Sequence, residues 1–379
     1  MAYESVDALQ RALTENVFYY AKDAKKAAGR ALGTLVEIIT FYLLKGWDYE
    51  RYTAIERRVA EYGNPDITHN VEFTLHPSFR IATVLLGRSG SPITSRKIIA
   101  KLPNEVKVPE TGIKGNVLLS SNGILRNACT LWESAESFGV GYLEKYDANS
   151  ATVGVYRLLD HPFAVLECKR VGVEEGMKKG PQTIEKAKQG AYVARAISSL
   201  QKVRLRNGAV HGILHTETGE MLCKPYVAFL EEIIVSNAPE ILKDFTLTVG
   251  VVSNHGNWFT SEDHNKELKV LAQSYDWLLF LTDAGLSEFV ETLLIKPKRE
   301  YESIRDAFAQ SYNGRRGVNR FTKVRIDLRA DQALQDFFRR NSCAVERWFN
   351  TISPKGRGIL ELKDELLTLA SKRWDEIFA

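Results

Sequence analysis

The sequence predicts an α/β protein with a mixed β-sheet flanked by helices. Short runs of β-branched and aromatic residues between turn residues are typical of strands, and other segments place apolar residues at helical spacing. From residue 122 onwards the two kinds follow the order helix, three-strand meander, helix, strand, helix, strand, helix. This order favours a sheet covered by helices.

The length and composition of the chain limit the domain organisation, partners and cofactors that can be expected. A chain of 379 residues can bury a large core as one elaborated domain or as two to three smaller ones. The net charge of +4 is only a faint sign of an anionic partner. Whether the partner is anionic must therefore be judged from where the basic residues lie in the chain. The four cysteines lack CxxC spacing, which favours reduced thiols in the cytoplasm. No phosphate-binding glycine loop is present, so no nucleotide cofactor is expected.

The first 119 residues divide into a helical part and a strand-containing part. Residues 1–62 are rich in Ala, Lys, Glu and Leu, which predicts helices. The apolar stretch 32–44 contains Glu37 and is short for a bilayer, so we expect a buried helix and no membrane association. Residues 71–103 alternate or run apolar and predict strands, and 102–116 predict a loop.

Residues 120–296 carry the predicted core. An apolar stripe (Leu125, Cys129, Trp132 and Phe138) predicts a helix over 122–138. We then expect strands at 139–144, 152–159, 163–169, 210–215, 245–252 and 277–282, and helices at 181–201, 262–275 and 286–294. Residues 297–379 predict a mainly helical region.

The most informative motif is Glu167-Cys-Lys169, in a strand that follows the turn Asp160-His-Pro162. Side chains alternate along a strand, so Glu167 and Lys169 share a face. Charges in a mostly apolar element are costly unless they are paired or bind a metal. Three other Glu-x-Lys pairs lie in a loop or in helical stretches, at 105/107, 267/269 and 361/363. The pair at 167/169 alone combines a strand, a preceding turn and an upstream Asp.

Two upstream acids could complete this motif. A hairpin turn centred on residues 160–162 would place Asp147 about 20 Å beyond the cross-strand partner of Glu167. Asp160 could instead meet Glu167 across a wide loop, so it is preferred. Asp147 stays open, because a bulge or a shorter strand could bring it in.

The helix, the meander with Asp160 and Glu167-Cys-Lys169, and the helix that follows resemble the PD-(D/E)XK nuclease superfamily, which includes type II restriction endonucleases. The later block Val251-Val-Ser-Asn, Phe259-Thr-Ser-Glu and Leu278-Leu-Phe-Leu-Thr-Asp283 is similar to the closing elements of modified-DNA restriction enzymes. The resemblance covers about residues 120–296. The usual Pro before the first acid is replaced by Leu159.

This resemblance implies a Mg²⁺-dependent endonuclease that cuts double-stranded DNA at a specific sequence, as in restriction-modification systems of prokaryotic cells. Asp160, Glu167 and Lys169 would be catalytic. Asp160, Glu167 and the Cys168 backbone carbonyl would bind Mg²⁺, which prefers hard oxygen ligands, with Glu133 as a further candidate. A structure-specific repair or recombination nuclease and a catalytically inactive DNA-binding module are the alternatives.

The same resemblance assigns roles outside the motif. Residues 1–119 could recognise DNA, and 297–379 could contact DNA or form a dimer. A homodimer is expected, because two-fold symmetry presents one site to each strand of a duplex. Residues expected at the DNA are polar or basic side chains near the motif or in a basic loop: Arg170, Lys178, Lys179, Gln189, Arg315, Arg316 and Arg320.

Overall fold

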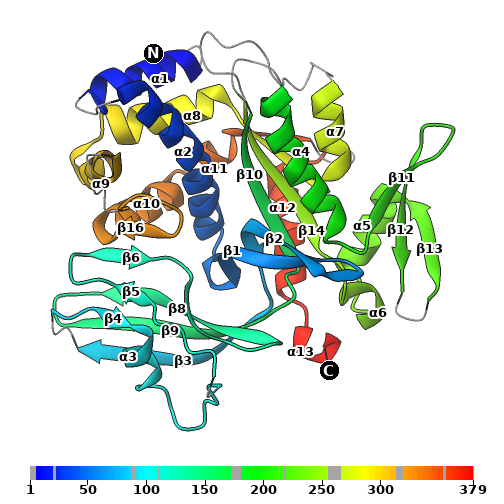
Figure 1. Cartoon of the computed structure of the whole chain (residues 1–379), viewed down its shortest axis with the longest axis horizontal. Helices are drawn as coiled ribbons and strands as arrows, with labels where there is room; N and C mark the ends of the chain where they lie inside the picture. Colours follow the sequence, from blue (N-terminus) through cyan, green and yellow to red (C-terminus); the bar gives the residue numbers. More distant parts are fainter. Residues whose placement is uncertain are drawn as a thin grey trace.

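A computed structural model of the chain describes residues 6–19, 23–87, 90–109, 111–171, 181–216, 219–254, 266–312, 319–352 and 356–378. It confirms the predicted class, because a mixed six-stranded sheet lies between layers of helices (Figure 1). The strand order is β1-β2-β10-β14-β15-β17. These strands are Thr53–Glu61, Asn64–Leu75, Ala164–Val171, Leu247–Asn254, Trp277–Leu281 and Phe349–Ile352.

Helices cover both faces of this sheet. On one face α2 (Ala24–Gly46) packs against β10 and β14, and Phe41 stacks on Phe73 of β2. The other face is covered by α4 (Pro181–Ala196) and α7 (Lys266–Ser274), which Figure 1 shows side by side. Apolar side chains fill the space between the sheet and each layer of helices, so the central strands are buried on both sides.

The helix α2 is longer than predicted. Its stretch Ala27–Gly46 is long and apolar enough, by length and composition, to cross a membrane. Within the molecule 67% of that apolar window is buried. The expected buried helix is therefore confirmed, with Leu32, Leu35 and Leu44 in the core.

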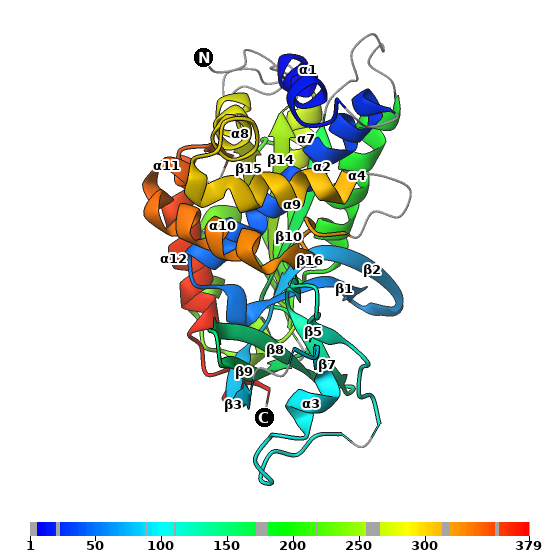
Figure 2. The ribbon, with the colours of Figure 1, turned by 90° about the vertical axis from the view of Figure 1, so that its left-hand side faces the viewer.

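Between β2 and β10 the chain forms most of a separate β module, residues 76–163, at one end of the molecule (Figures 1 and 2), and the later strand β16 joins it by pairing with β6. One sheet has the order β3-β9-β8-β7, and the other has the order β16-β6-β5-β4. The elements are β3 (Ser78–Gly87), β4 (Ile93–Thr94), α3 (Ser95–Ile99), β5 (Val117–Leu119), β6 (Ile124–Arg126), β7 (Cys129–Glu133), β8 (Ser137–Tyr146), β9 (Ser150–Leu159) and β16 (Arg325–Asp327).

The helix predicted over 122–138 is wrong. This segment forms β6, β7 and the start of β8, with Ala128 at a φ of 45° between the first two. The apolar residues that suggested a helical stripe are all buried, but they belong to separate strands. Residues 53–61, included in the predicted helical part, form β1 because pairing with β2 outweighs local propensity.

The predicted hairpin around Asp160 is also wrong. The strand β9 pairs with β3 and β8, whereas β10 pairs with β2 and β14. Both edges of β9 are therefore occupied within the module, and the turn at 160–162 carries the chain from one sheet into the other. The backbone N–H of Phe163 then donates to the Leu75 carbonyl at 2.8 Å, which starts the pairing with β2.

The remaining elements largely follow the prediction. The predicted strand at 210–215 is β12 (Val210–His215), between β11 (Gln201–Arg204) and β13 (Met221–Pro225). The helix expected at 286–294 is α8 (Asp283–Val290), which continues as the π-helical turn η2 (Glu291–Ile295). Further helices are α1 (Val6–Asn16), α5 (Tyr226–Val235), α6 (Pro239–Leu242), α9 (Glu302–Tyr312), α10 (Leu328–Arg340), α11 (Ser342–Glu346), α12 (Ile359–Ala370) and α13 (Trp374–Ile377).

Candidate active site between β2, β10 and α4

The strand β10 places its alternating side chains as predicted. Leu166 and Cys168 belong to the core on the α2 face. Glu167 and Lys169 face α4, and the Lys169 Nζ lies 2.8 Å from the Glu167 Oε2. Glu167 is only 3% exposed, whereas the Lys169 side chain is 26% exposed. The strand thus presents a buried carboxylate next to a partly accessible ammonium group.

A cavity opens where β2 leaves β10. Pairing between these strands covers Ala164–Leu166, whereas the pairing of β10 with β14 continues to Val171. The separation of β2 makes room for a cavity of about 500 Å³. It is lined by His69, Asn70, Glu167, Lys169, Gln189, Gly190, Tyr192 and Val193.

A second carboxylate reaches Lys169 from β2. The Glu72 Oε1 lies 3.8 Å from the Lys169 Nζ, so this ammonium group stands between Glu72 and Glu167. Glu72 is a site residue that the sequence alone does not indicate. Its segment was correctly expected to be a strand, but a local pattern does not show that residues 72 and 167 belong to neighbouring strands.

A buried lysine from the C-terminal region completes this charged cluster. Lys323 is 5% exposed, and its Nζ lies 3.4 Å from the Glu37 Oε2 and 3.3 Å from the Glu56 Oε1. It also forms an ion pair with Glu72. Because a buried ammonium group is costly without partners, these carboxylates from α2, β1 and β2 stabilise it.

The carboxylate of Glu167 is only partly satisfied. Burial raises the pKa of Glu167, and Lys169 and His69 oppose this shift electrostatically. Among the described residues, the buried Glu167 Oε1 has no hydrogen-bond partner. A buried oxygen without a partner is costly and is a common sign of a functional site.

The raised pKa of Glu167 predicts a pH-dependent cost to stability. The fold favours the protonated carboxyl, so this stabilising contribution is present below the ordinary pKa of 4.5 and is lost as the pH rises through the raised value. We therefore expect Glu167→Gln to melt at a higher temperature than the wild type near neutral pH, with the difference shrinking toward pH 4. Thermal unfolding across this pH range measures the effect. A difference that is independent of pH would contradict it.

Gly190 lets α4 approach the site closely. A Cβ at this position would lie 2.6 Å from the Tyr275 hydroxyl and 3.4 Å from the Lys169 Cε. The absence of a side chain therefore allows the helix to pack closely against Tyr275, next to Lys169. Gln189, a predicted DNA-contacting residue, is exposed on the same helix and lines the same cavity.

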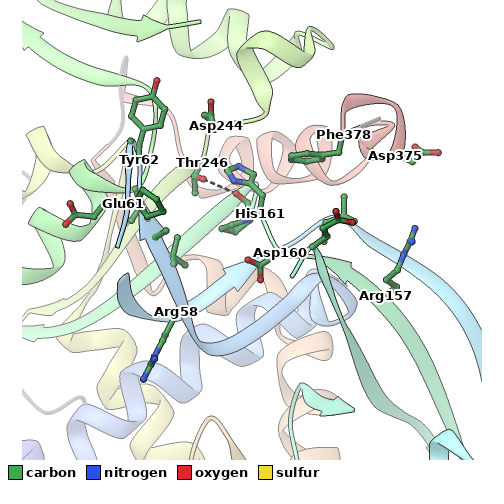
Figure 3. Close-up of a pocket in the computed structure, with 18 of the residues that line it drawn as sticks. Arg58, Glu61, Tyr62, Arg157, Asp160, His161, Asp244, Thr246, Asp375 and Phe378 are labelled. Carbon is green, nitrogen blue, oxygen red and sulfur yellow. Dashed lines mark hydrogen bonds between the residues drawn. The ribbon is translucent and has the colours of Figure 1, made fainter. Parts of the chain in front are cut away.

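The predicted first acid lies elsewhere. Asp160 lines a different cavity of about 870 Å³, where it lies beside His161 and between Glu61 and Arg157 (Figure 3). Its Oδ1 accepts a hydrogen bond from the Arg57 Nη2 at 2.9 Å. Arg57 also binds Glu133 at 3.1 Å, so the structure brings Asp160 and Glu133 together around an arginine. It does not bring either of them to Glu167, because the β9–β10 hairpin does not exist.

The alternative acid, Asp147, is also remote from Glu167 in the fold. It lies in the turn between β8 and β9, where its Oδ1 accepts hydrogen bonds from the N–H groups of Asn149 at 2.9 Å and Ser150 at 2.8 Å. These bonds lower the pKa of Asp147. Its contacts are those of a residue that stabilises a tight turn.

The structure describes only some of the basic residues that were predicted to contact DNA. The Arg320 Nη1 pairs with the Asp327 Oδ2 at 3.3 Å, beside β16. The backbone of Arg170 belongs to β10, but its side chain lies outside the described set. The remaining predicted basic residues lie outside the described residues: Lys178, Lys179, Arg315 and Arg316.

Comparison with known proteins adds no relative. No protein-family model, curated protein or solved structure matches this chain.

Proposed function

We propose that the chain is a Mg²⁺-dependent endonuclease that hydrolyses phosphodiester bonds of double-stranded DNA at a specific sequence, like the type II restriction enzymes of the PD-(D/E)XK superfamily. The observation that carries the proposal is the cavity beside β10. There Glu167 and Lys169 share one face, and Glu72 reaches the same lysine from β2. A homodimer would place one such site at each DNA strand.

The order of elements supports this proposal. The chain runs through α2, the antiparallel strands β1, β2 and β10, and then α4, β14, α7 and β15, with the three-stranded sheet β11–β13 and the helices α5 and α6 inserted between α4 and β14. This is the order of helix, three-strand meander, helix, strand, helix and strand expected from the resemblance. Residues 24–75 supply its first half in place of residues 122–159, and the β module is inserted before the third strand.

The site has groups that suit Mg²⁺. This ion prefers a few carboxylate or carbonyl oxygens and retains several water molecules. Candidate ligands are Glu72, Glu167 and the Cys168 backbone carbonyl, and the buried Glu167 Oε1 lacks a hydrogen-bond partner within the described structure. In the described ranges, no three His, Cys, Asp or Glu side chains are grouped closely enough to hold a metal alone. A site with one or two carboxylates and water ligands fits both observations.

The charge around the site also favours a cation. Among the described residues, Glu37, Glu56, Glu72 and Glu167 form ion pairs with two ammonium groups, those of Lys169 and Lys323. Burial raises the pKa of Glu37 as well as that of Glu167, although Lys323 opposes the shift at Glu37. A divalent cation would lower the electrostatic cost of keeping these carboxylates ionised.

In the proposed reaction, each described side chain has a separate task. When bound, Mg²⁺ lowers the pKa of a coordinated water and offsets charge on the phosphate. Lys169 places its ammonium group beside Glu167, where it stabilises the negative charge that develops on the phosphate oxygens. Gln189 and Tyr192 lie at the wall of the cavity formed by α4, where they can position the DNA backbone.

Incubating the protein with unmodified plasmid and phage DNA in Mg²⁺ tests this function. Discrete fragments with uniform ends are expected from the wild type, and EDTA should prevent their formation. Glu167→Gln and Lys169→Ala should each slow cleavage by about 10²–10³-fold, because each removes a group that stabilises the transition state.

A matched control is available in another Glu-x-Lys pair. Lys363→Ala changes a lysine on α12, outside the cavity, and should cut like the wild type. Intact DNA after incubation with the wild type would contradict the proposal, as would undiminished cleavage by Glu167→Gln. Cleavage of many unrelated duplexes would instead favour a structure-specific repair nuclease.

A further inference from the structure

His69 forms a hydrogen-bonded triad at the wall of the cavity that contains Glu167 and Lys169. Its Nε2 lies 2.7 Å from the Glu61 Oε1. The hydroxyl of Tyr192 donates to the same oxygen at 2.8 Å, and the two rings meet edge to face with centroids 5.7 Å apart. His69 is therefore held by a residue of β1 on one side and by a residue of α4 on the other.

The partners of the triad define the state of the imidazole. Hydrogen bonds from His69 and Tyr192 lower the pKa of Glu61, so this carboxylate is ionised at neutral pH and accepts hydrogen bonds only. The Nε2 must therefore carry the hydrogen that is donated to Glu61. In a neutral ring this leaves the lone pair on Nδ1, which is the basic atom of that tautomer.

The position of His69 is suited to proton transfer. Its side chain is 21% exposed, so it is accessible from the cavity while its orientation is restrained. The titratable groups that face it, within the described residues, are Glu61 from β1, Tyr192 from α4, and Glu167 and Lys169 from β10. Glu167 is bound to Lys169, and the Tyr192 hydroxyl donates to Glu61. The Nδ1 of His69 takes no part in the triad, so His69 is better placed than either residue to accept a proton.

We propose that His69 is the general base of this site, oriented by Glu61 and Tyr192 as positioning residues. The inference rests on the nuclease function proposed above. In the step, a water oxygen forms a bond to phosphorus and its proton passes to the His69 Nδ1. The bond from phosphorus to the leaving oxygen breaks, the electron pair stays on that oxygen, and the oxygen then takes a proton from solvent.

The first test measures cleavage of a mapped target duplex in Mg²⁺ as a function of pH. His69→Ala should lower kcat by about 10²–10⁴-fold, the usual contribution of a general base. It should also abolish the rise in rate that follows deprotonation of the base. Added imidazole should restore part of the activity, because the small molecule can occupy the vacated space and accept the proton.

The matched control is His161→Ala, which removes a histidine from the other cavity, where its Nε2 faces the Phe245 carbonyl at 3.1 Å. This variant should retain the pH profile and show no response to imidazole. If His69→Ala keeps the wild-type rate, or loses it without rescue and with an unchanged pH profile, the base assignment fails while the nuclease proposal stands. If the wild type cuts no DNA, the nuclease proposal fails and the inference falls with it.

A second readout needs neither metal nor DNA. Nitrogen-15 spectra of the metal-free protein, recorded at a pH at which the imidazole groups are neutral, should show the hydrogen of His69 on Nε2. Glu61→Ala should remove this preference, while circular dichroism should show that the fold is retained. A hydrogen on Nδ1 in the wild type would overturn the assignment independently of any activity.

Discussion

Glu72→Gln is expected to reduce Mg²⁺-dependent DNA cleavage by about 10²–10³-fold, whereas Asp160→Asn should leave it close to that of the wild type. The two variants should differ because the two carboxylates lie at different places in the fold. Glu72 lies 3.8 Å from the Lys169 Nζ, whereas Asp160 is bound to Arg57 in a different cavity. Initial cleavage rates of the two variants, compared with those of Glu167→Gln, measure the effect.

Binding of Mn²⁺ in the absence of DNA provides an independent check on this pair of variants. Glu72→Gln should weaken the binding and Asp160→Asn should not, because only Glu72 lies at the proposed metal site. Circular dichroism identifies any variant that fails to fold. If Asp160→Asn loses both cleavage and Mn²⁺ binding while Glu72→Gln keeps them, the site lies around Arg57, and the first acid is the one that the sequence suggested.

Asp331→Ala should destabilise the protein by about 3–5 kcal/mol, the usual cost of removing one partner of a buried ion pair. Asp331 on α10 is 2% exposed and accepts hydrogen bonds from the Lys45 Nζ at 2.8 Å and the Tyr42 hydroxyl at 2.6 Å. Without it, Lys45 stays buried with Glu50 as its remaining acidic partner, at 2.9 Å. Chemical unfolding of the wild type and the variant measures the difference.

An exposed aspartate is the control for this prediction. Asp306 pairs with Arg305 at 3.1 Å on the surface of α9, and its side chain is 55% exposed. Its replacement by Ala should change the free energy of unfolding by no more than about 1 kcal/mol, because exposed ion pairs contribute little. Similar losses in both variants would show that burial of the Asp331 network does not stabilise the contact between α2 and α10.

The parts of the fold that the sequence predicted well are those in which local periodicity and packing agree. The strands β10, β14 and β15 are short, apolar runs bounded by turn residues, and they are buried on both faces. In β10 the alternation that put Glu167 and Lys169 on one face depends only on the strand itself. These two residues could therefore be placed next to each other without knowledge of the neighbouring strands.

The parts that failed depend on contacts between distant residues. Strands of three to five residues, such as β6 and β7, are too short to show a clear two-residue period, and their apolar residues matched a helical spacing by coincidence. Glu72 and Lys323 reach the site only because the chain returns to it from far away in sequence. No local pattern distinguishes such residues from other charged side chains.

The position of the proposed catalytic strand β10 does not depend on the size of the β module that is inserted between β2 and β10. Leu75 and Ala164 are direct partners in the ladder, so the chain leaves and re-enters the central sheet at one point. The register there is defined by the pairs from Ala164 to Leu166 and not by the length of residues 76–163. Since doubling the length of a flexible loop costs only about 0.6 kcal/mol of closure entropy, a segment of very different length can be accommodated at this junction. Insertions and deletions in the parts of that segment that do not contact β16 or Lys323 can therefore accumulate without moving Glu167 and Lys169 relative to Glu72.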